Sequence, residues 1–223
     1  MNYSVFEDLQ KFITIEGLLL GRDHWVYITN LGILKTYTQA MVKHNKKEVM
    51  ALINRFVEIK NNSIVFVRSR TEEVDQAGRK PRIEFVPRTL IEKNGQYSFT
   101  YTLKITEICP AFRGQLLQVM DHDEKNQPVP QFQIMLDKMQ LCTRTPEKQK
   151  IICELKPGKI HEIKFVIDFD TEKVKGSIDK FTFIQDFKAC PTEYMLQLQY
   201  GIYGTEGHDA ISEIYAMEFK KIK

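Results

Sequence analysis

The chain of 223 residues lacks any long apolar run, and its first ten residues include acidic side chains. A helix that crosses a bilayer needs about 20 predominantly apolar residues, and a secretory leader needs a basic start followed by an apolar centre. We therefore expect neither a transmembrane segment nor a signal peptide in the chain as given. The protein is expected to be cytoplasmic if this chain is complete, and secreted or periplasmic if it is a processed form.

Motifs of several function classes are also absent. The sequence contains no Gly-rich phosphate loop, no nucleophile elbow and no internal repeat. Cys109, Cys142, Cys153 and Cys190 lack the spacing of a zinc site, and isolated thiols in apolar strands are usually core residues. In an exported protein, the four thiols would allow two disulfides in any of three connectivities. We expect no metal and no cofactor.

The net charge says little about the binding partner, because a value of +3 neither requires nor excludes an anionic partner. A local basic excess at residues 68–88 is either an anion-facing segment or a solvated loop. Asp168, Asp170 and Glu172 lie close together in the sequence. For these carboxylates, a solvated acidic turn is favoured over a calcium site. The single tryptophan, Trp25, is expected to pack in the core or within the N-terminal part of the chain.

Alternation of apolar and polar residues with a period of two recurs along the chain and indicates β-strands. It is clearest at 97–105, 132–136 and 163–169, and turn residues such as Asn94-Gly95 separate these segments. Many short strands between turns favour an antiparallel two-sheet sandwich over a parallel sheet. We expect an all-β sandwich at 63–223, long enough to bury a substantial core.

One segment departs from this pattern. Val49, Leu52, Ile53, Phe56 and Val57 follow helical spacing, which predicts an amphipathic helix at about 45–60. We expect residues 1–62 to form an N-terminal extension whose single helix packs on the sandwich with its polar side solvated.

Residues 195–204 separate an apolar face from a polar face most clearly. One parity holds Leu196, Leu198, Tyr200 and Ile202, and the other holds Gln197, Gln199 and Tyr203 with Gly201 between them. Two other expected strands carry similar polar faces. In 81–88, one parity holds Arg82, Glu84 and Arg88. In 115–120, Gln118 lies on the other face of the strand from Leu117 and Val119. If these strands share a sheet, the polar residues are expected to line one open surface. Their chemistry suits a hydroxyl-rich acidic polymer better than an apolar small molecule.

Several weak motifs follow one another in an order that resembles a known family. They are Arg82-x-Glu84, Gln118-Val119-x, Pro130-x-Phe132-x-Ile134-x-Leu136, the strand-turn-strand at 168–179, and Tyr200-Gly-Ile-Tyr-Gly204. Together they look like the concanavalin-type jelly rolls of polysaccharide lyases, with the heparin lyase I and alginate lyase groups most similar. The resemblance covers roughly 63–223. It implies a jelly-roll sandwich that cleaves an acidic, uronic-acid-containing glycan by β-elimination.

The resemblance also implies roles for individual residues. Arg82 and Gln118 would neutralise the substrate carboxylate and so stabilise the enolate-like charge of the transition state. Tyr203 would act as general acid, and as base too if neighbouring positive charge lowers its pKa. Glu84, Arg88, Gln197 and Gln199 would bind the substrate.

Two positions depart from the family pattern. Met120 stands where the Gln-x-His motif of the alginate group supplies a base, and Gln199 stands where a lysine precedes the glycine of the terminal motif. His122 is the histidine nearest to Met120 and is a further catalytic candidate.

Three functions from different classes therefore stay open: a polysaccharide lyase, a carbohydrate-binding module of the same fold without catalysis, and a protein-interaction sandwich. An acidic polysaccharide is the expected partner of the first two. We expect no nucleic acid and no membrane as partners.

Overall fold

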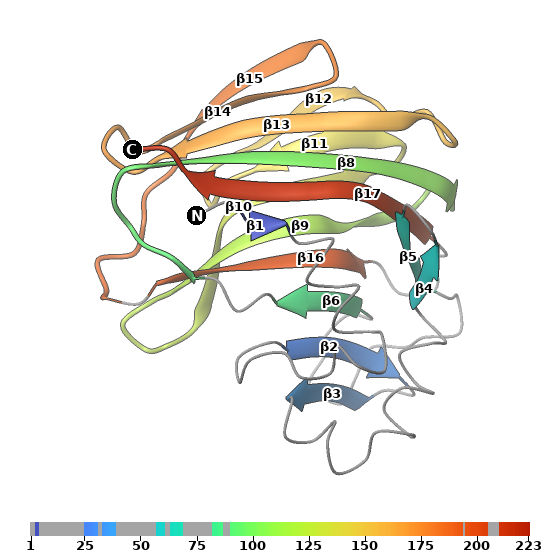
Figure 1. Cartoon of the computed structure of the whole chain (residues 1–223), viewed down its shortest axis with the longest axis horizontal. Helices are drawn as coiled ribbons and strands as arrows, with labels where there is room; N and C mark the ends of the chain where they lie inside the picture. Colours follow the sequence, from blue (N-terminus) through green and yellow to red (C-terminus); the bar gives the residue numbers. More distant parts are fainter. Residues whose placement is uncertain are drawn as a thin grey trace.

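A computed structural model of the chain describes residues 3–4, 25–30, 33–38, 57–60, 63–68, 82–86, 90–193, 195–204 and 210–223. Within these residues, the regular elements are all β-strands, and their pairings are antiparallel. The strands form two sheets (Figure 1). The all-β, antiparallel two-sheet fold expected from the sequence is confirmed. In the described segments, no helix has the length and apolarity needed to cross a membrane.

The first sheet, sheet A, has eight strands in the order β15-β14-β13-β8-β17-β5-β4, and β1 pairs with β17 outside this path. In chain order they are β1 (Tyr3–Ser4), β4 (Val57–Lys60), β5 (Ser63–Arg68), β8 (Gln96–Ile108), β13 (Ile160–Asp168), β14 (Lys173–Ile178), β15 (Phe181–Asp186) and β17 (Ala210–Lys221). The longest strands, β8 and β17, pair with each other and form the centre of sheet A.

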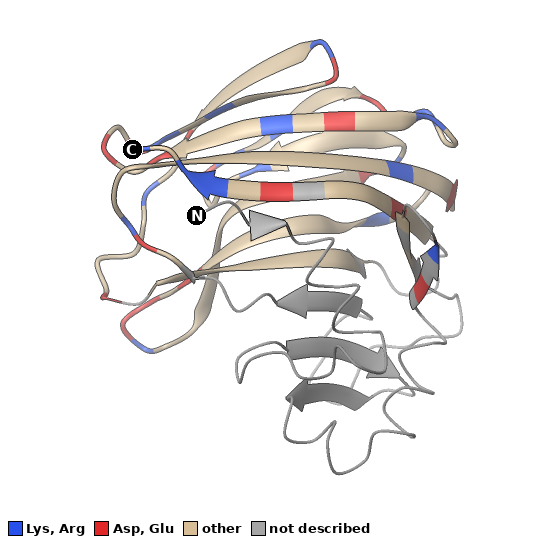
Figure 2. Ribbon diagram, viewed as in Figure 1, with Lys and Arg blue, Asp and Glu red and all other residues tan. Residues whose placement is uncertain are grey.

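The second sheet, sheet B, has nine strands in the order β12-β11-β10-β9-β16-β6-β2-β3, and β7 pairs with β16. In chain order they are β2 (Trp25–Asn30), β3 (Ile33–Thr38), β6 (Arg82–Val86), β7 (Leu90–Ile91), β9 (Arg113–His122), β10 (Pro128–Asp137), β11 (Gln140–Arg144), β12 (Gln149–Glu154) and β16 (Leu196–Gly204). β16 lies between β9 and β6. It carries no charged residue, whereas β13 and β17 of sheet A carry several (Figure 2).

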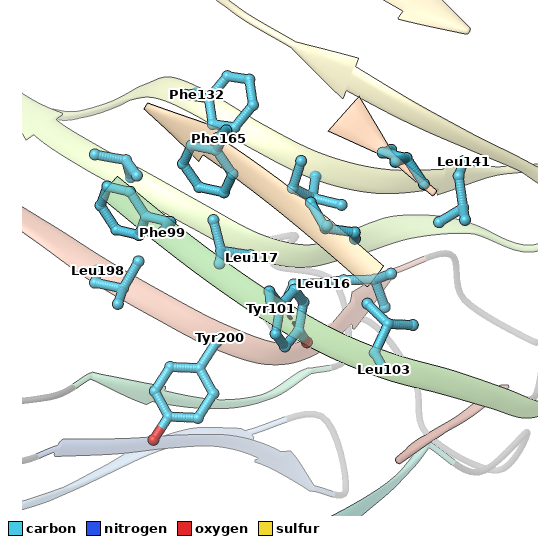
Figure 3. Close-up of a cluster of buried hydrophobic side chains, with 14 of the residues drawn as sticks. Phe99, Tyr101, Leu103, Leu116, Leu117, Phe132, Leu141, Phe165, Leu198 and Tyr200 are labelled. Carbon is cyan, nitrogen blue, oxygen red and sulfur yellow. Dashed lines mark hydrogen bonds between the residues drawn. The ribbon is translucent and has the colours of Figure 1, made fainter. Parts of the chain in front are cut away.

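The core lies between the two sheets and is built from the apolar parity of their long strands (Figure 3). Eight side chains assigned to it by alternation are 0–3 % exposed: Phe99, Tyr101, Leu103, Phe165, Ile167, Leu196, Leu198 and Ile202. Each of them belongs to one parity of its strand, as a face-to-face sandwich requires. The predicted core is confirmed.

Aromatic rings join the two sheets. Phe165 of β13 stacks on Phe99 of β8 at a centroid distance of 4.5 Å, and Phe132 of β10 lies 4.9 Å from Phe165. Because β10 belongs to sheet B, Phe165 connects the sheets. Such aromatic pairs contribute about 0.5–1.5 kcal/mol beyond the area they bury. The buried hydroxyl of Tyr101 also crosses the interface and donates to the Leu116 carbonyl oxygen at 3.5 Å.

The helix expected at 45–60 lies mostly outside the described residues, and its last four residues are a strand instead. Val57–Lys60 form β4, in which Ile59 is opposite Ile64 of β5. β-branched residues favour strands, and pairing with β5 outweighs the local helical spacing at this end. The other described strands of the first 62 residues also belong to the two sheets, since β1 pairs with β17 and β2 pairs with β6.

The four cysteines are free thiols, so the structure contains none of the disulfides that an exported chain would allow. Burial, with the nearby Asp137 carboxylate, raises the pKa of Cys142 to about 11. Burial also raises the pKa values of Cys153 and Cys190. These thiols therefore stay protonated at neutral pH and are poor nucleophiles.

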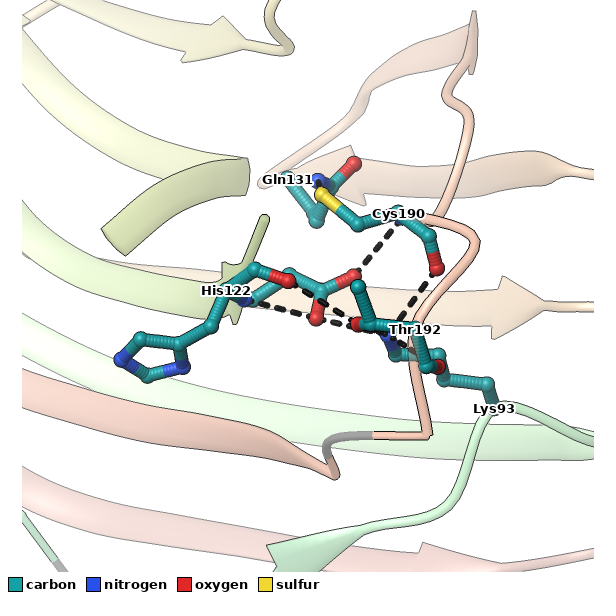
Figure 4. A network of polar contacts seen from close by, with 6 residues as sticks. Lys93, His122, Gln131, Cys190 and Thr192 are labelled. Carbon is teal, nitrogen blue, oxygen red and sulfur yellow. Dashed lines mark hydrogen bonds and ion pairs between the residues drawn. The ribbon is translucent and has the colours of Figure 1, made fainter. Parts of the chain in front are cut away.

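A buried ion pair ties together three segments that are distant in the sequence (Figure 4). Asp121, near the end of β9, is fully buried, and its Oδ1 lies 2.7 Å from Lys93 Nζ. Lys93, which lies between β7 and β8, also donates to the carbonyl oxygens of Cys190 and Thr192 at 3.0 and 3.1 Å. The Cys190 N–H donates to Asp121 Oδ2 at 2.8 Å. These contacts hold the end of β9 against the segment that leads into β16.

Asp179 organises the turn between β14 and β15, where its φ is 53°. Its Oδ2 accepts hydrogen bonds from Lys159 Nζ at 2.7 Å and from His161 Nδ1 at 3.0 Å, and its Oδ1 accepts one from the Glu162 N–H. Burial alone would raise the pKa of Asp179, but these donors outweigh burial and hold the pKa below its usual value. The ionised form of Asp179 therefore stabilises the fold.

The lowered pKa of Asp179 predicts a loss of stability in acid. A carboxylate whose pKa is lower in the folded than in the unfolded state stabilises the fold above its unfolded pKa of about 3.9. That contribution disappears as the pH falls through the folded pKa. Asp179→Asn should lower the free energy of unfolding by about 1–2 kcal/mol at pH 7, and the difference from wild type should shrink towards pH 3. Urea unfolding at both pH values measures this.

Asp186→Asn provides the control, because Asp186 is largely exposed and pairs with Lys173 at 3.2 Å on the neighbouring strand. Exposed ion pairs contribute little, so this variant should stay close to wild type at both pH values. A destabilisation by Asp179→Asn that is equal at pH 7 and pH 3 would contradict the assigned role.

The buried pair of Lys93 and Asp121 predicts a large effect of Lys93→Met. The substitution leaves the Asp121 carboxylate buried without its cation, which costs about 3–5 kcal/mol. The double variant Lys93→Met/Asp121→Asn removes the uncompensated charge and should unfold at a higher urea concentration than Lys93→Met alone. Lys221→Met, which breaks the exposed pair with Glu92, should cost less than about 1 kcal/mol. Equal effects of Lys93→Met and Lys221→Met would show that the buried pair is not important for stability.

Candidate functional site

All four residues expected to be catalytic lie on the adjacent strands β6, β16 and β9 of sheet B, and three of them come from neighbouring positions along these strands. Tyr203 of β16 is opposite Arg82 of β6 on one side and opposite Gln115 of β9 on the other. Opposed positions of an antiparallel pair have Cβ atoms about 4.5–5.5 Å apart. Gln118 is three positions from Gln115 along β9, which is about 10 Å at the usual strand rise. The register therefore brings Arg82, Tyr203 and Gln118 to one region of the sheet.

A β-bulge lies directly before Tyr203. The register of β16 against β9 shifts between Tyr200 and Tyr203, and Gly201 within this interval has a φ of 143°. Residues other than glycine rarely adopt such a φ because of their Cβ atom. Gly201 is also the partner of Glu84 on β6. The backbone conformation at the bulge therefore explains why the terminal motif has a glycine at position 201. Bulges change the direction of a strand and are common next to functional sites.

A row of glutamines crosses sheet B beside Tyr203. Gln199 of β16 is opposite Gln118 of β9, which in turn is opposite Gln133 of β10. The Gln133 Nε2 donates to the Gln118 Oε1 at 2.6 Å. Gln118 and Gln199 are only 3 % and 8 % exposed, so these two are buried and not part of an open surface as expected from the sequence. Gln197 is half-buried. The bond between Gln133 and Gln118 satisfies one polar group of each of these two side chains, whereas the Gln133 Oε1 has no partner in the described part of the chain.

The sequence interpretation missed Gln133, although a signal for it was present. Gln133 lies between Phe132 and Ile134, which are both buried in the core. Its parity is therefore opposite to that of the core, as is the parity of Gln118 on β9. Alternation predicts the face of Gln133, but it does not predict that β10 pairs with β9.

His122 lies at the far end of β9 from Tyr203. From Gln115, the partner of Tyr203, to His122 is seven positions, or about 23 Å along a strand. The His122 N–H donates to Asp121 Oδ1 at 2.7 Å, and its carbonyl oxygen accepts from Thr192 Oγ1 at 2.9 Å. Figure 4 shows its imidazole pointing away from these groups. The structure does not bring His122 and Tyr203 together at one reacting atom.

The Asp168 carboxylate is engaged by its own turn. Its Oδ1 accepts hydrogen bonds from the N–H groups of Asp170 and Thr171 at 3.0 and 3.2 Å. Burial opposes the ionised form, but these bonds and one from Gln96 prevail and lower the pKa of Asp168. This geometry is that of an acidic turn. Across the described ranges, no group of three or more His, Cys, Asp or Glu side chains has an arrangement suited to a metal ion.

Met120, at the position of the base in the alginate group, is opposite Gln197 of β16. Arg88 lies outside the described residues.

No family model and no curated protein sequence matches the chain. Its structure, however, is similar to those of solved lyases. The alginate lyase A1-II', a member of polysaccharide lyase family 7, gives a TM-score of 0.69 at 12% identity over 89% of this chain and 94% of that chain. An alginate lyase from Pseudomonas aeruginosa gives 0.69 at 10% identity over 89% and 98%. An endo-β-1,4-glucuronan lyase from the fungus Trichoderma reesei gives 0.57 at 12% identity over 74% and 86%.

One solved form of A1-II' has a histidine replaced by asparagine and a tyrosine replaced by phenylalanine, and it is in complex with substrate. At 10–12% identity, these similarities concern the fold. The resemblance to jelly-roll alginate lyases seen in the sequence is confirmed at that level. The chain has the two-sheet jelly roll that these alginate and glucuronan lyases share.

Proposed function

We propose that the protein is a polysaccharide lyase that cleaves an acidic, uronate-containing glycan by β-elimination. The observation that carries the proposal is the pairing of Tyr203 with Arg82 beside the Gly201 bulge. The jelly roll of alginate and glucuronan lyases supports it. Gln118 on the adjacent strand β9 provides a third polar group.

In the proposed reaction, Arg82 and Gln118 donate to the substrate carboxylate. Their donors stabilise the negative charge that develops on the carboxylate when the C5 proton leaves. Tyr203 in its phenolate form removes this proton, the C4–O bond breaks, and a C4–C5 double bond forms. The phenol then returns the proton to the departing oxygen. Positive charge beside a phenol favours the phenolate, which fits the position of Arg82 opposite Tyr203.

Substrate binding in this proposal falls to the polar residues around the catalytic group. Gln197 of β16 is half-buried and offers its amide group to sugar hydroxyls. Gln199 is buried and lies behind this surface. Glu84 and Arg88 are the further residues proposed for substrate binding. His122 is left out of the catalytic set because it lies about 23 Å from the Tyr203 position along β9.

A non-catalytic carbohydrate-binding module is the second candidate. It is favoured by Met120, which stands opposite Gln197 where the alginate group has a histidine. In this alternative, the same residues hold a glycan without breaking it. The two candidates differ in one observable, the ultraviolet absorbance of an unsaturated uronate product.

Tyr203→Phe tests the proposed acid and base. The substitution keeps the ring but removes the hydroxyl that exchanges the proton. Turnover should fall by about a hundredfold or more, while glycan binding changes little. The assay follows product absorbance on a panel of uronate polymers, with binding measured by calorimetry.

Tyr215→Phe is the matched control, because Tyr215 belongs to β17 of sheet A. This variant should retain wild-type turnover. If Tyr203→Phe retains it as well, Tyr203 is not the proposed acid. If the wild-type protein binds a polymer but releases no unsaturated product, the binding module replaces the lyase.

Arg82→Ala should weaken both binding and turnover. A guanidinium that neutralises the carboxylate acts in the ground state as well as in the transition state, so both KM and kcat should change. Lys164→Ala, on β13 of sheet A, removes one positive charge away from the site and should have little effect on either. A change in KM alone for Arg82→Ala would limit Arg82 to substrate binding.

A further inference from the structure

Strand β15 lies at one end of sheet A, at the upper rim of the molecule in Figure 1. It pairs with β14 along its whole length without a register shift. In the described part of the chain, no strand pairs with its other edge. Two apolar side chains of β15 are well exposed, Ile184 at 59 % and Phe181 at 43 %. The free edge of β15 therefore combines backbone groups that have no neighbouring strand with exposed apolar side chains.

The strands at the other ends of the two sheets differ from β15. Sheet A ends at β4 on its far side, and sheet B ends at β12 and at β3. Each of these strands contains a lysine, and they are Lys60, Lys150 and Lys35. β12 also has a register shift against β11. Lysines and bulges prevent an edge strand from pairing with another chain. β15 has neither of them, because Phe181–Gln185 are uncharged.

We infer that β15 is a self-association site, at which two copies of the chain pair their β15 strands in antiparallel orientation. The pairing continues sheet A from one copy into the other. An uncharged free edge is a template for such an added strand. A two-fold axis uses the same surface of both copies, so this single edge is sufficient for a closed dimer. The inference is independent of the proposed lyase function, since no residue of the candidate site belongs to β15.

Charged side chains select one register for this pairing. Directly opposed residues of an antiparallel pair lie on the same face of the sheet, so the two-fold axis must pass beside a residue that is opposed to itself. With the axis at Phe183, Lys180 of each copy is opposite Asp186 of the other. With the axis at Ile184, Lys180 is opposite Lys188, which is repulsive. An axis one residue before Phe183 gives neither charge a charged partner. The register centred on Phe183 is therefore favoured.

The positions of Lys180 and Asp186 suit a contact across the free edge. Lys180 lies in the turn directly before β15, and its Nζ is 5.5 Å from the centroid of the Phe181 ring. Asp186 is the last residue of β15 and lies 3.2 Å from Lys173 of β14, but its side chain is 74 % exposed. A lysine of a second copy can therefore approach the Asp186 carboxylate from the open side.

Sedimentation velocity tests whether the free edge of β15 forms a dimer. The wild-type protein should show a monomer–dimer equilibrium between about 1 and 300 µM, because an interface of one strand from each copy is small and its association weak. Ile184→Lys puts a charge on the free edge and should raise the dissociation constant at least about tenfold. Thermal unfolding shows whether the variant is folded.

Ile160→Lys is the matched control. Ile160 is similarly exposed, at 48 %, but it belongs to β13, which has neighbours on both sides. Both substitutions place the new lysine opposite a lysine of the adjacent strand, Lys104 for Ile160 and Lys175 for Ile184. Ile160→Lys should leave the dissociation constant unchanged. Equal effects of the two substitutions would overturn β15 as the interface.

Two charge variants test the register centred on Phe183. Lys180→Glu alone opposes Glu to Asp186 at both symmetric contacts, and Asp186→Lys alone opposes two lysines, so each should dimerise at least about tenfold more weakly than wild type. A mixture of the two variants restores opposite charges at both contacts and should form a heterodimer with nearly wild-type affinity. Lys125→Glu, in the exposed turn between β9 and β10, makes the same change in net charge and should behave like wild type.

The mixing experiment separates pairing across the interface from damage to either copy, because a misfolded variant is not rescued by its partner. A mixture that stays monomeric would overturn the proposed register. A wild-type protein that is monomeric over the whole concentration range would overturn self-association, and this result is also expected if the edge instead accepts an extended segment of another protein.

Discussion

The register of β16 between β9 and β6 is the constraint on which the candidate site depends. A slip of one residue would move every side chain of β16 to the other face of the sheet. Leu196, Leu198 and Ile202 are fully buried in the core, and each contributes about 1.5–3 kcal/mol through burial. A slip would expose them together. The apolar parity of β16 therefore determines that Gln199 and Tyr203 take the opposite parity, next to Gln118 and Arg82.

Much of the fold follows from local pattern. Alternation in β8, β13 and β16 predicts their core faces, because a strand buried on one side leaves a period of two in its sequence. The turn residues between them predict antiparallel neighbours. For the same reason, the parity of Gln118, Gln199 and Tyr203 predicts their face before their neighbours are known. The order of weak motifs adds the jelly roll, which the solved lyases confirm as the fold.

The contacts that the sequence did not reveal are those between distant segments. Lys93 contacts Asp121 at the end of β9 and the backbone at Cys190, which come from segments distant from Lys93 in the sequence. Hydrophobic periodicity does not predict such a pair, because Lys93 and Asp121 are polar residues on different segments of the chain. The helical spacing at 45–60 is a similar case, because the pairing of β4 with β5 depends on a strand that local spacing does not include. His122 seemed close to Met120 in sequence, but the strand carries it away from Tyr203.

The energetic cost of burying charge explains why neutral amides lie at the centre of the site. Burying a charge without a partner is much more costly than burying an amide that is hydrogen-bonded. Gln118, Gln133 and Gln199 are buried next to one another, and a histidinium or lysine at Met120 or Gln199 would place a charge beside them. With uncharged groups there, the polar face is stable without substrate. In the proposed reaction, positive charge then comes from Arg82, and Gln118 contributes a neutral amide, whose burial costs less than that of a second charged group.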